Sequence, residues 1–151
     1  MTEPIIKTIQ VPCGAAQAFD VFVHRIGAWW PLDGHAVSAA AGKAALDVTI
    51  EPWVGGAVYE TMHDGTRAAW GEIVEYTDGR KIAMTWYPGN NANNATRVDV
   101  AFEALSDDLT RVTLTHSGWE VWGDAAQDKR ANYNSGWDIV FGTHFAQAVA
   151  A

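Results

Sequence analysis

The stretch TRAAWGEIVEYTDGRKIAMTWYP, residues 66–88, contains the pattern that decides the fold. Two runs rich in β-branched and aromatic residues, 66–77 and 81–88, flank the pair Asp78-Gly79. An Asp-Gly pair between two such runs is a strong local signal for a tight β-hairpin. The stretch therefore predicts two antiparallel strands joined by a short turn.

The same alternation of strand and turn continues on both sides of this hairpin. The further strand-like runs are residues 46–53, 57–64, 96–105 and 110–118. Short turn sequences separate them: Gly55-Gly56, Asp64-Gly65, the Gly- and Asn-rich segment 89–94, and Ser106-Asp107-Asp108. Six successive strands with such connections predict a large antiparallel meander.

The two ends of the chain add one more strand and the helices. We expect a strand over 5–11, a helix over 14–24, a short second helix or turn over 25–32 and a loop over 33–44. We expect a long amphipathic helix over 131–151, with one face formed by Tyr133, Trp137, Val140, Phe141, His144 and Ala148. This order predicts a single α+β domain spanning 1–151, in which a curved antiparallel sheet of about seven strands wraps around the C-terminal helix.

Composition excludes several classes of function. The chain has 10 Lys and Arg against 18 Asp and Glu, a net charge of −8, so nucleic acids and anionic membrane surfaces are not expected partners. The N-terminus lacks the features of a signal peptide, and no run approaches the ~20 apolar residues of a membrane span. Cys13 is the single cysteine, which excludes an intramolecular disulfide and favours a reducing, cytoplasmic location.

Four segments in this order resemble a known family. They are IIKTIQVPCGAAQAFDVFVHRIGAWWPL at 5–32, WGEIVEYTDGRKIAMTWYPG at 70–89, RVTLTHSGWE at 111–120 and NYNSGWDIV at 132–140. Together they resemble the START-like, helix-grip superfamily, often labelled SRPBCC, which includes the major birch-pollen allergen and polyketide cyclases. Within it, they look most like the family named for the activator of the ninety-kilodalton heat-shock chaperone ATPase. The resemblance covers nearly the whole chain and implies the helix-grip fold.

The eight tryptophans are the unusual feature of the composition. In a helix-grip fold, aromatic residues from the sheet and the C-terminal helix can face one another around a cavity, the usual composition of a small-molecule pocket. The alternative is that these rings fill the interior. The residues expected at a ligand are Trp30, Trp70, Trp86, His116, Trp119, Tyr133, Trp137 and Phe141.

The sequence THSGWE, residues 115–120, invites a hydrolase interpretation that strand geometry excludes. Adjacent strand residues point to opposite faces, so His116 cannot act as the base for Ser117. His116 shares its face with Val112 and Leu114 and is expected to point inward. There it either orients a ligand or transfers a proton, or is an ordinary core histidine bonded to a carbonyl or an acid.

The acidic residues and remaining histidines give weaker signals. Glu72 could act as an acid or base if it faced the interior, but Ile73 leaves that face undecided, and Glu60 and Asp138 are equally ambiguous. Solvated carboxylates are the expected case for all three. The histidines show no metal-ligand spacing, so we expect no metal, no cofactor and no assignable catalytic residue.

Three functions from different classes remain open. The first is a module that binds a hydrophobic small molecule between the sheet and the C-terminal helix. The second is a cyclase- or dehydratase-like enzyme that uses His116 and Glu72. The third is an interaction protein that contacts a chaperone, although the separate gripping domain of the chaperone activator is absent from these 151 residues. A weak homodimer is also left open.

Overall fold

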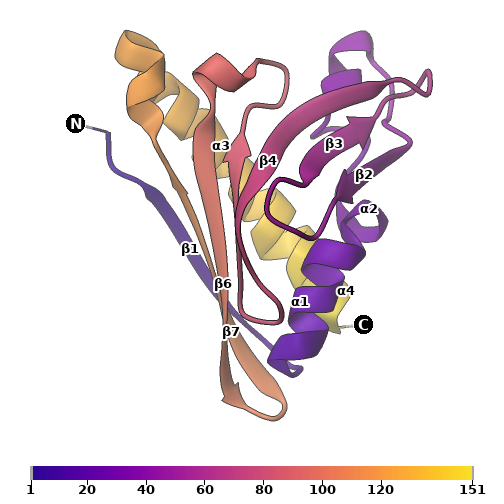
Figure 1. Ribbon diagram of the computed structural model, residues 1–151, viewed down its shortest axis with the longest axis vertical. Coiled ribbons are helices and arrows are strands. Elements are labelled where there is room, and N and C mark those ends of the chain that lie inside the picture. The colour runs from indigo at the N-terminus through magenta and orange to yellow at the C-terminus, as the bar shows by residue number, and fades with distance from the viewer. Residues whose placement is uncertain (1, 151) are drawn as a thin grey trace.

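A computed structural model describes residues 2–150 and contains the predicted seven-stranded antiparallel sheet with a long C-terminal helix (Figure 1). The strands are β1 (Ile5–Val11), β2 (Asp47–Ile50), β3 (Ala57–Thr61), β4 (Arg67–Thr77), β5 (Lys81–Trp86), β6 (Thr96–Ser106) and β7 (Leu109–Ser117). The helices are α1 (Ala15–His24), α2 (Ile26–Trp29), α3 (Ala126–Ile139) and α4 (Ala146–Ala150). Short helical turns are η1 (Val37–Ala41), η2 (Ala92–Asn94), η3 (Trp119–Ala125) and the π-helical η4 (Val140–Phe145).

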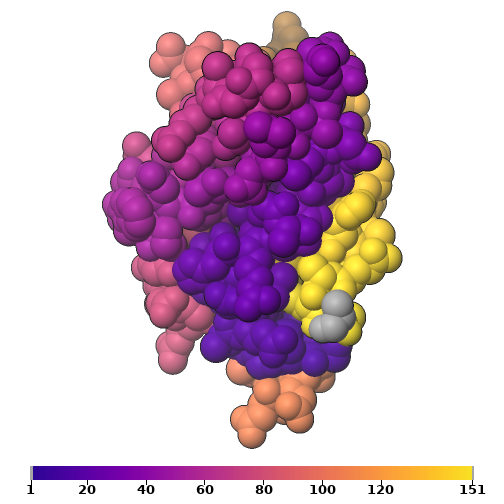
Figure 2. All heavy atoms as spheres, turned by 90° about the vertical axis from the view of Figure 1, so that its right-hand side faces the viewer, coloured from indigo at the N-terminus to yellow at the C-terminus, as the bar shows by residue number. Residues whose placement is uncertain are grey.

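The strand order is β1-β7-β6-β5-β4-β3-β2, with every neighbouring pair antiparallel. The meander from β2 to β7 is therefore confirmed, and β1 closes the far edge by pairing with β7. The C-terminal helix lies across one face of this curved sheet (Figure 1), while α1 and α2 lie beside that helix (Figure 2). Large apolar side chains from both layers fill the space between them.

Strand β4 departs from simple alternation because it contains two irregularities. Its register shifts once opposite Val58 and Tyr59 of β3, and again between Ile73 and Glu75 opposite β5. Each shift places an extra residue in β4, and such bulges change which side chains point inward. Trp70 and Ile73 are consequently buried, whereas Glu72 is exposed on the opposite face.

Gly71 allows β4 to approach β5 closely at the first bulge. A Cβ atom added at Gly71 would overlap the carbonyl oxygen of Thr85 in the neighbouring strand. The backbone there is also tied to β5 by hydrogen bonds from the Glu72 amide to Thr85 Oγ1 (2.9 Å) and from the Tyr87 amide to the Trp70 carbonyl (2.6 Å). No flexible side chain can move aside to make room, so the two strands themselves would have to separate.

We therefore expect Gly71→Ala to lower the free energy of unfolding by about 2–3 kcal/mol, since overpacked sites typically cost this much. Urea denaturation measures the change. Gly142→Ala is the matched control, because its added Cβ meets open space on the C-terminal helix. That variant should be neutral or more stable by up to ~1 kcal/mol. Equal stability of the two variants would contradict the close approach.

The C-terminal helix differs in detail from the prediction. It begins at Ala126 rather than at residue 131, and the π-helical turn η4 interrupts it. Tyr133, Trp137, Val140 and Phe141 lie on the inner side as expected. From the end of η4 onward, however, Phe145 and Val149 are the buried residues, whereas His144 and Ala148 are only half-buried. The wider π turn holds an extra residue, which rotates the rest of the helix by about one position.

Candidate functional site

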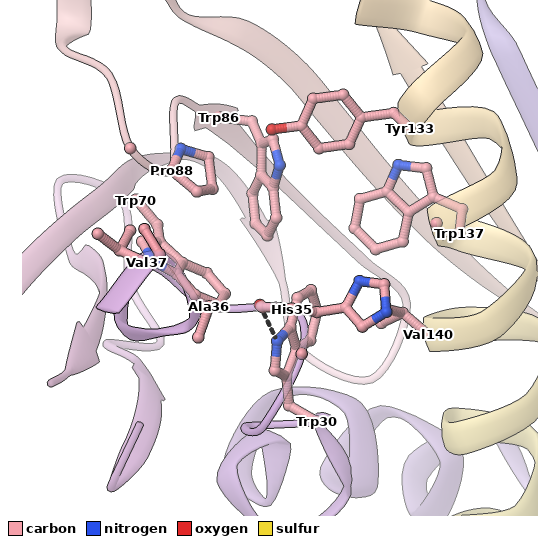
Figure 3. Close-up of a pocket in the computed structure, with 14 residues that line it drawn as sticks. Trp30, His35, Ala36, Val37, Trp70, Trp86, Pro88, Tyr133, Trp137 and Val140 are labelled. Atoms are coloured by element: carbon pink, nitrogen blue, oxygen red, sulfur yellow. Dashed lines mark hydrogen bonds between the residues drawn. The ribbon is translucent and has the colours of Figure 1, made fainter. Parts of the chain in front are cut away.

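A pocket of about 460 Å³, partly open to solvent, lies where the sheet, the C-terminal helix and the 33–44 segment meet (Figure 3). Four tryptophans line it: Trp30 after α2, Trp70 on β4, Trp86 on β5 and Trp137 on α3. Tyr133, Gly136 and Val140 complete the helix side, while the remaining wall consists of residues 34–37, Ala40, Pro88 and Gly89. The lining is therefore mainly aromatic and apolar.

The indole rings contact one another rather than standing alone. Ring centroids are 5.1 Å apart for Trp30 and Trp70, 5.5 Å for Trp70 and Trp86, and 5.5 Å for Trp86 and Trp137. All of these pairs are tilted or edge-to-face, the arrangements that aromatic quadrupoles favour. Mutual packing therefore supports each ring, and the pocket has flat aromatic walls.

Three of the four indole N–H groups donate hydrogen bonds to protein acceptors. Trp30 Nε1 donates to the His35 carbonyl oxygen at 2.7 Å (Figure 3), and Trp70 Nε1 donates to Glu60 Oε1 at 3.1 Å. Trp137 Nε1 donates to His116 Nδ1 at 3.0 Å. These bonds hold the rings in place and leave no free N–H group on any of the three.

Trp86 differs from the other three tryptophans. Its Nε1 is the one buried side-chain nitrogen or oxygen without a hydrogen-bond partner among residues 2–150. The Tyr133 hydroxyl points toward this indole (Figure 3), but no hydrogen bond joins the two groups. Burial raises the pKa of the Tyr133 phenol, while the nearby Trp86 N–H acts in the opposite direction. Tyr133 is therefore a neutral hydroxyl at neutral pH.

Glu60 is fully buried and holds the η1 wall of the pocket, contrary to the expectation of a solvated carboxylate. Its Oε1 accepts from the Val37 amide (2.6 Å) and from Trp70 Nε1. Its Oε2 accepts from the Ser38 amide (2.9 Å) and from Ser38 Oγ (2.8 Å). The carboxylate thus satisfies the first free N–H groups of η1, as a helix-capping side chain does.

His116 faces inward as predicted, but it lies behind the pocket wall and does not line it. An indole N–H can only donate, so His116 Nδ1 accepts from Trp137 and the ring proton lies on Nε2. Nε2 then donates to Thr96 Oγ1 (2.6 Å), which in turn donates to the Trp86 carbonyl oxygen (3.1 Å). Burial lowers the pKa of His116 to about 3, so the ring is neutral. Its partners are therefore a hydroxyl and an indole, rather than the carbonyl or acid expected for a core histidine.

Comparison with known families identifies the group to which this arrangement belongs. Residues 15–150 match the family described as "Activator of Hsp90 ATPase homolog 1-like protein". The chain is a member of this family. The resemblance seen in the sequence segments is thereby confirmed. A comparison with curated proteins finds no match.

Solved structures similar to this family member cover nearly its whole length. The anthrahydroquino-γ-pyrone synthase Txn09, complexed with SUM, is 27% identical, with 98% of this chain and 97% of that chain covered and a TM-score of 0.67. The Aha1 dimer from Colwellia psychrerythraea is 16% identical, with 98% and 96% covered and a TM-score of 0.68. Protein MLL2253 from Mesorhizobium loti is 12% identical, with 97% and 96% covered and a TM-score of 0.69. The last two likenesses establish the fold alone.

Of the eight residues expected at a ligand, this member of the activator family brings five to the pocket: Trp30, Trp70, Trp86, Tyr133 and Trp137. The other three, His116, Trp119 and Phe141, are fully buried outside the pocket lining. Trp119 donates its indole N–H to the His116 carbonyl oxygen (3.0 Å), and Phe141 stacks on Phe145 at 5.6 Å. These three residues belong to the packed interior.

Sequence reasoning missed the wall contributed by residues 34–37 and Ala40, because a small, polar segment without periodicity gives no sign of where it folds back. It also missed Glu60, although Glu60 alternates with the buried Val58 along β3, a pattern that could have indicated its inward position. Among residues 2–150 no group of three or more His, Cys, Asp or Glu side chains could hold a metal ion. Within the same range, every helix is too short or too polar to cross a membrane.

Proposed function

We propose that this chain binds a flat, mainly apolar small molecule in the pocket between the sheet and the C-terminal helix. The observation that carries the proposal is the set of four mutually packed indoles around a space of about 460 Å³. A cavity of this size and composition is typical of small-molecule sites. The 27% identical synthase, whose structure is complexed with SUM, supports the same use of the fold.

Filling the pocket from the helix side is expected to abolish binding. Gly136 lines the pocket, and a Cβ atom added there approaches only His35, at 4.0 Å, so a longer side chain would extend into the open space. Gly136→Leu should weaken binding at least tenfold without disturbing the packed rings behind the wall. Quenching of tryptophan fluorescence by a panel of flavonoids, sterols and fatty acids measures the affinity.

Gly142→Leu is the matched control, because Gly142 lies on the same C-terminal helix, is exposed and does not line the pocket. It should bind as the unmodified chain does. If no compound in the panel gives saturable quenching, or if both leucine variants bind equally well, the pocket is not the ligand site.

The enzyme alternative is supported by the synthase likeness but requires different residues from those expected. Glu72 is exposed on the outer face of the sheet, and both ring nitrogens of His116 are already engaged behind the wall. Any proton transfer in the pocket would therefore involve the His35 ring or the Tyr133 hydroxyl, the side chains of this kind that line it. Turnover that survives both His35→Gln and Tyr133→Phe would exclude this version.

A further inference from the structure

Two polar groups lie side by side on the aromatic wall of the pocket, the Trp86 indole N–H and the Tyr133 hydroxyl (Figure 3). Three of its four indole N–H groups are consumed by protein acceptors, which leaves Trp86 Nε1 as the exception. The Tyr133 hydroxyl points toward that N–H (Figure 3), and the N–H acts on the pKa of the phenol. Buried polar groups are almost always paired, so the buried Trp86 N–H without a partner requires an explanation.

We propose that the bound ligand is a planar aromatic compound carrying a carbonyl oxygen, and that this oxygen accepts a hydrogen bond from Tyr133 beside the Trp86 indole. This inference rests on the proposed function and deepens it by naming the ligand's chemistry. A flat ring system matches the indole walls, and the ligand oxygen supplies an acceptor for the Tyr133 hydroxyl.

The geometry explains why Tyr133 makes the direct contact. Trp86 Nε1 is shielded from solvent, and the Tyr133 oxygen points toward the same indole (Figure 3). When the Trp86 N–H approaches a lone pair of that oxygen, the Tyr133 hydrogen is free to point to the ligand. Trp86 is thus a positioning residue, and Tyr133 is the donor that meets the carbonyl. This donor disfavours a ligand without an acceptor, because such a ligand would cover the O–H and leave it unpaired.

Fluorenone and fluorene form a matched pair of probes, since both are flat tricyclic molecules and only fluorenone carries a carbonyl. We expect the unmodified chain to bind fluorenone about fivefold more tightly than fluorene, as one net hydrogen bond of ~1 kcal/mol would give. In Tyr133→Phe the ratio of the two Kd values should fall to about 1. The carbonyl stretching band of bound fluorenone should also lie at lower wavenumber in the unmodified chain than in Tyr133→Phe.

Tyr59→Phe is the control variant, because Tyr59 lies on β3 outside the pocket. It should keep the fivefold preference. Equal binding of fluorenone and fluorene to the unmodified chain would overturn the inference while leaving the proposed function intact. If Tyr133→Phe still prefers fluorenone to fluorene and its carbonyl band is unshifted, the inference is also overturned while the proposed function remains. If neither probe binds, the proposed function fails, and this inference fails with it.

Discussion

Glu60→Ala is expected to lower the free energy of unfolding by about 4 kcal/mol, one of the two largest effects that we expect from single positions in this chain. Glu60 accepts four hydrogen bonds, from two amides and a hydroxyl of η1 and from Trp70. Alanine would leave these donors buried without an acceptor. Urea denaturation measures the loss, and amide hydrogen exchange at Val37 and Ser38 should show that η1 opens first.

Glu60→Gln is expected to lower the free energy of unfolding by about 2–3 kcal/mol, although glutamine has nearly the same shape as glutamate. Each carboxylate oxygen receives an N–H donor, so the amide nitrogen of glutamine would face a second donor at either position. The control is Glu72→Ala, which removes an exposed carboxylate from the neighbouring strand and should change stability by less than ~0.5 kcal/mol. A Glu60→Ala variant as stable as Glu72→Ala would show that Glu60 does not hold η1.

The loss of Glu60 should also weaken ligand binding in the pocket. Val37 and Ala36 form part of its wall, and Glu60 anchors that wall to β3 and to Trp70. In Glu60→Ala the tryptophan quenching by any flavonoid that binds the unmodified chain should weaken, whereas Glu72→Ala should bind normally. The stability of η1 and the shape of the pocket thus depend on the same carboxylate.

Much of the fold could be predicted from local patterns, and the exceptions have physical causes. Asp78-Gly79 and the alternating runs around it predicted the hairpin, since turn chemistry and strand alternation act over a few residues. The inward face of β4 could not be predicted, because its bulges depend on pairing with β3 and β5. Likewise, nothing within the C-terminal helix sequence indicated the π turn that replaces His144 by Phe145 in the core.

The candidate site could likewise be predicted only in part. Aromatic residues on the sheet and on the helix predicted five pocket residues, because both layers must face each other across the interior. Which rings border the space and which fill it depends on packing between distant segments. Trp119 and Phe141 are aromatic like the wall residues, yet both are fully buried. Trp119 packs against Tyr133 of α3 at 5.7 Å, a contact that the local sequence does not predict.

The second large effect concerns acid stability, which is expected to depend on His116. In the unfolded chain this histidine binds a proton near pH 6.5, whereas in the folded protein burial lowers its pKa to about 3. Between these two values the unfolded state holds more protons, so folding stability falls as the pH falls. The expected contribution is a loss of about 2 kcal/mol between pH 7 and pH 5, and of about 3 kcal/mol at pH 4.

Urea denaturation at several pH values tests this, with His116→Gln compared to the unmodified chain. The variant should be less stable at pH 7, because Trp137 and Thr96 lose their shared partner, but its stability should change less between pH 7 and pH 5. His144→Gln, a half-buried histidine on the same C-terminal helix, should keep the full pH dependence. A parallel pH dependence in all three proteins would mean that His116 takes up a proton without unfolding. Its bond from Trp137 would then have to be replaced, because a protonated ring has no acceptor nitrogen.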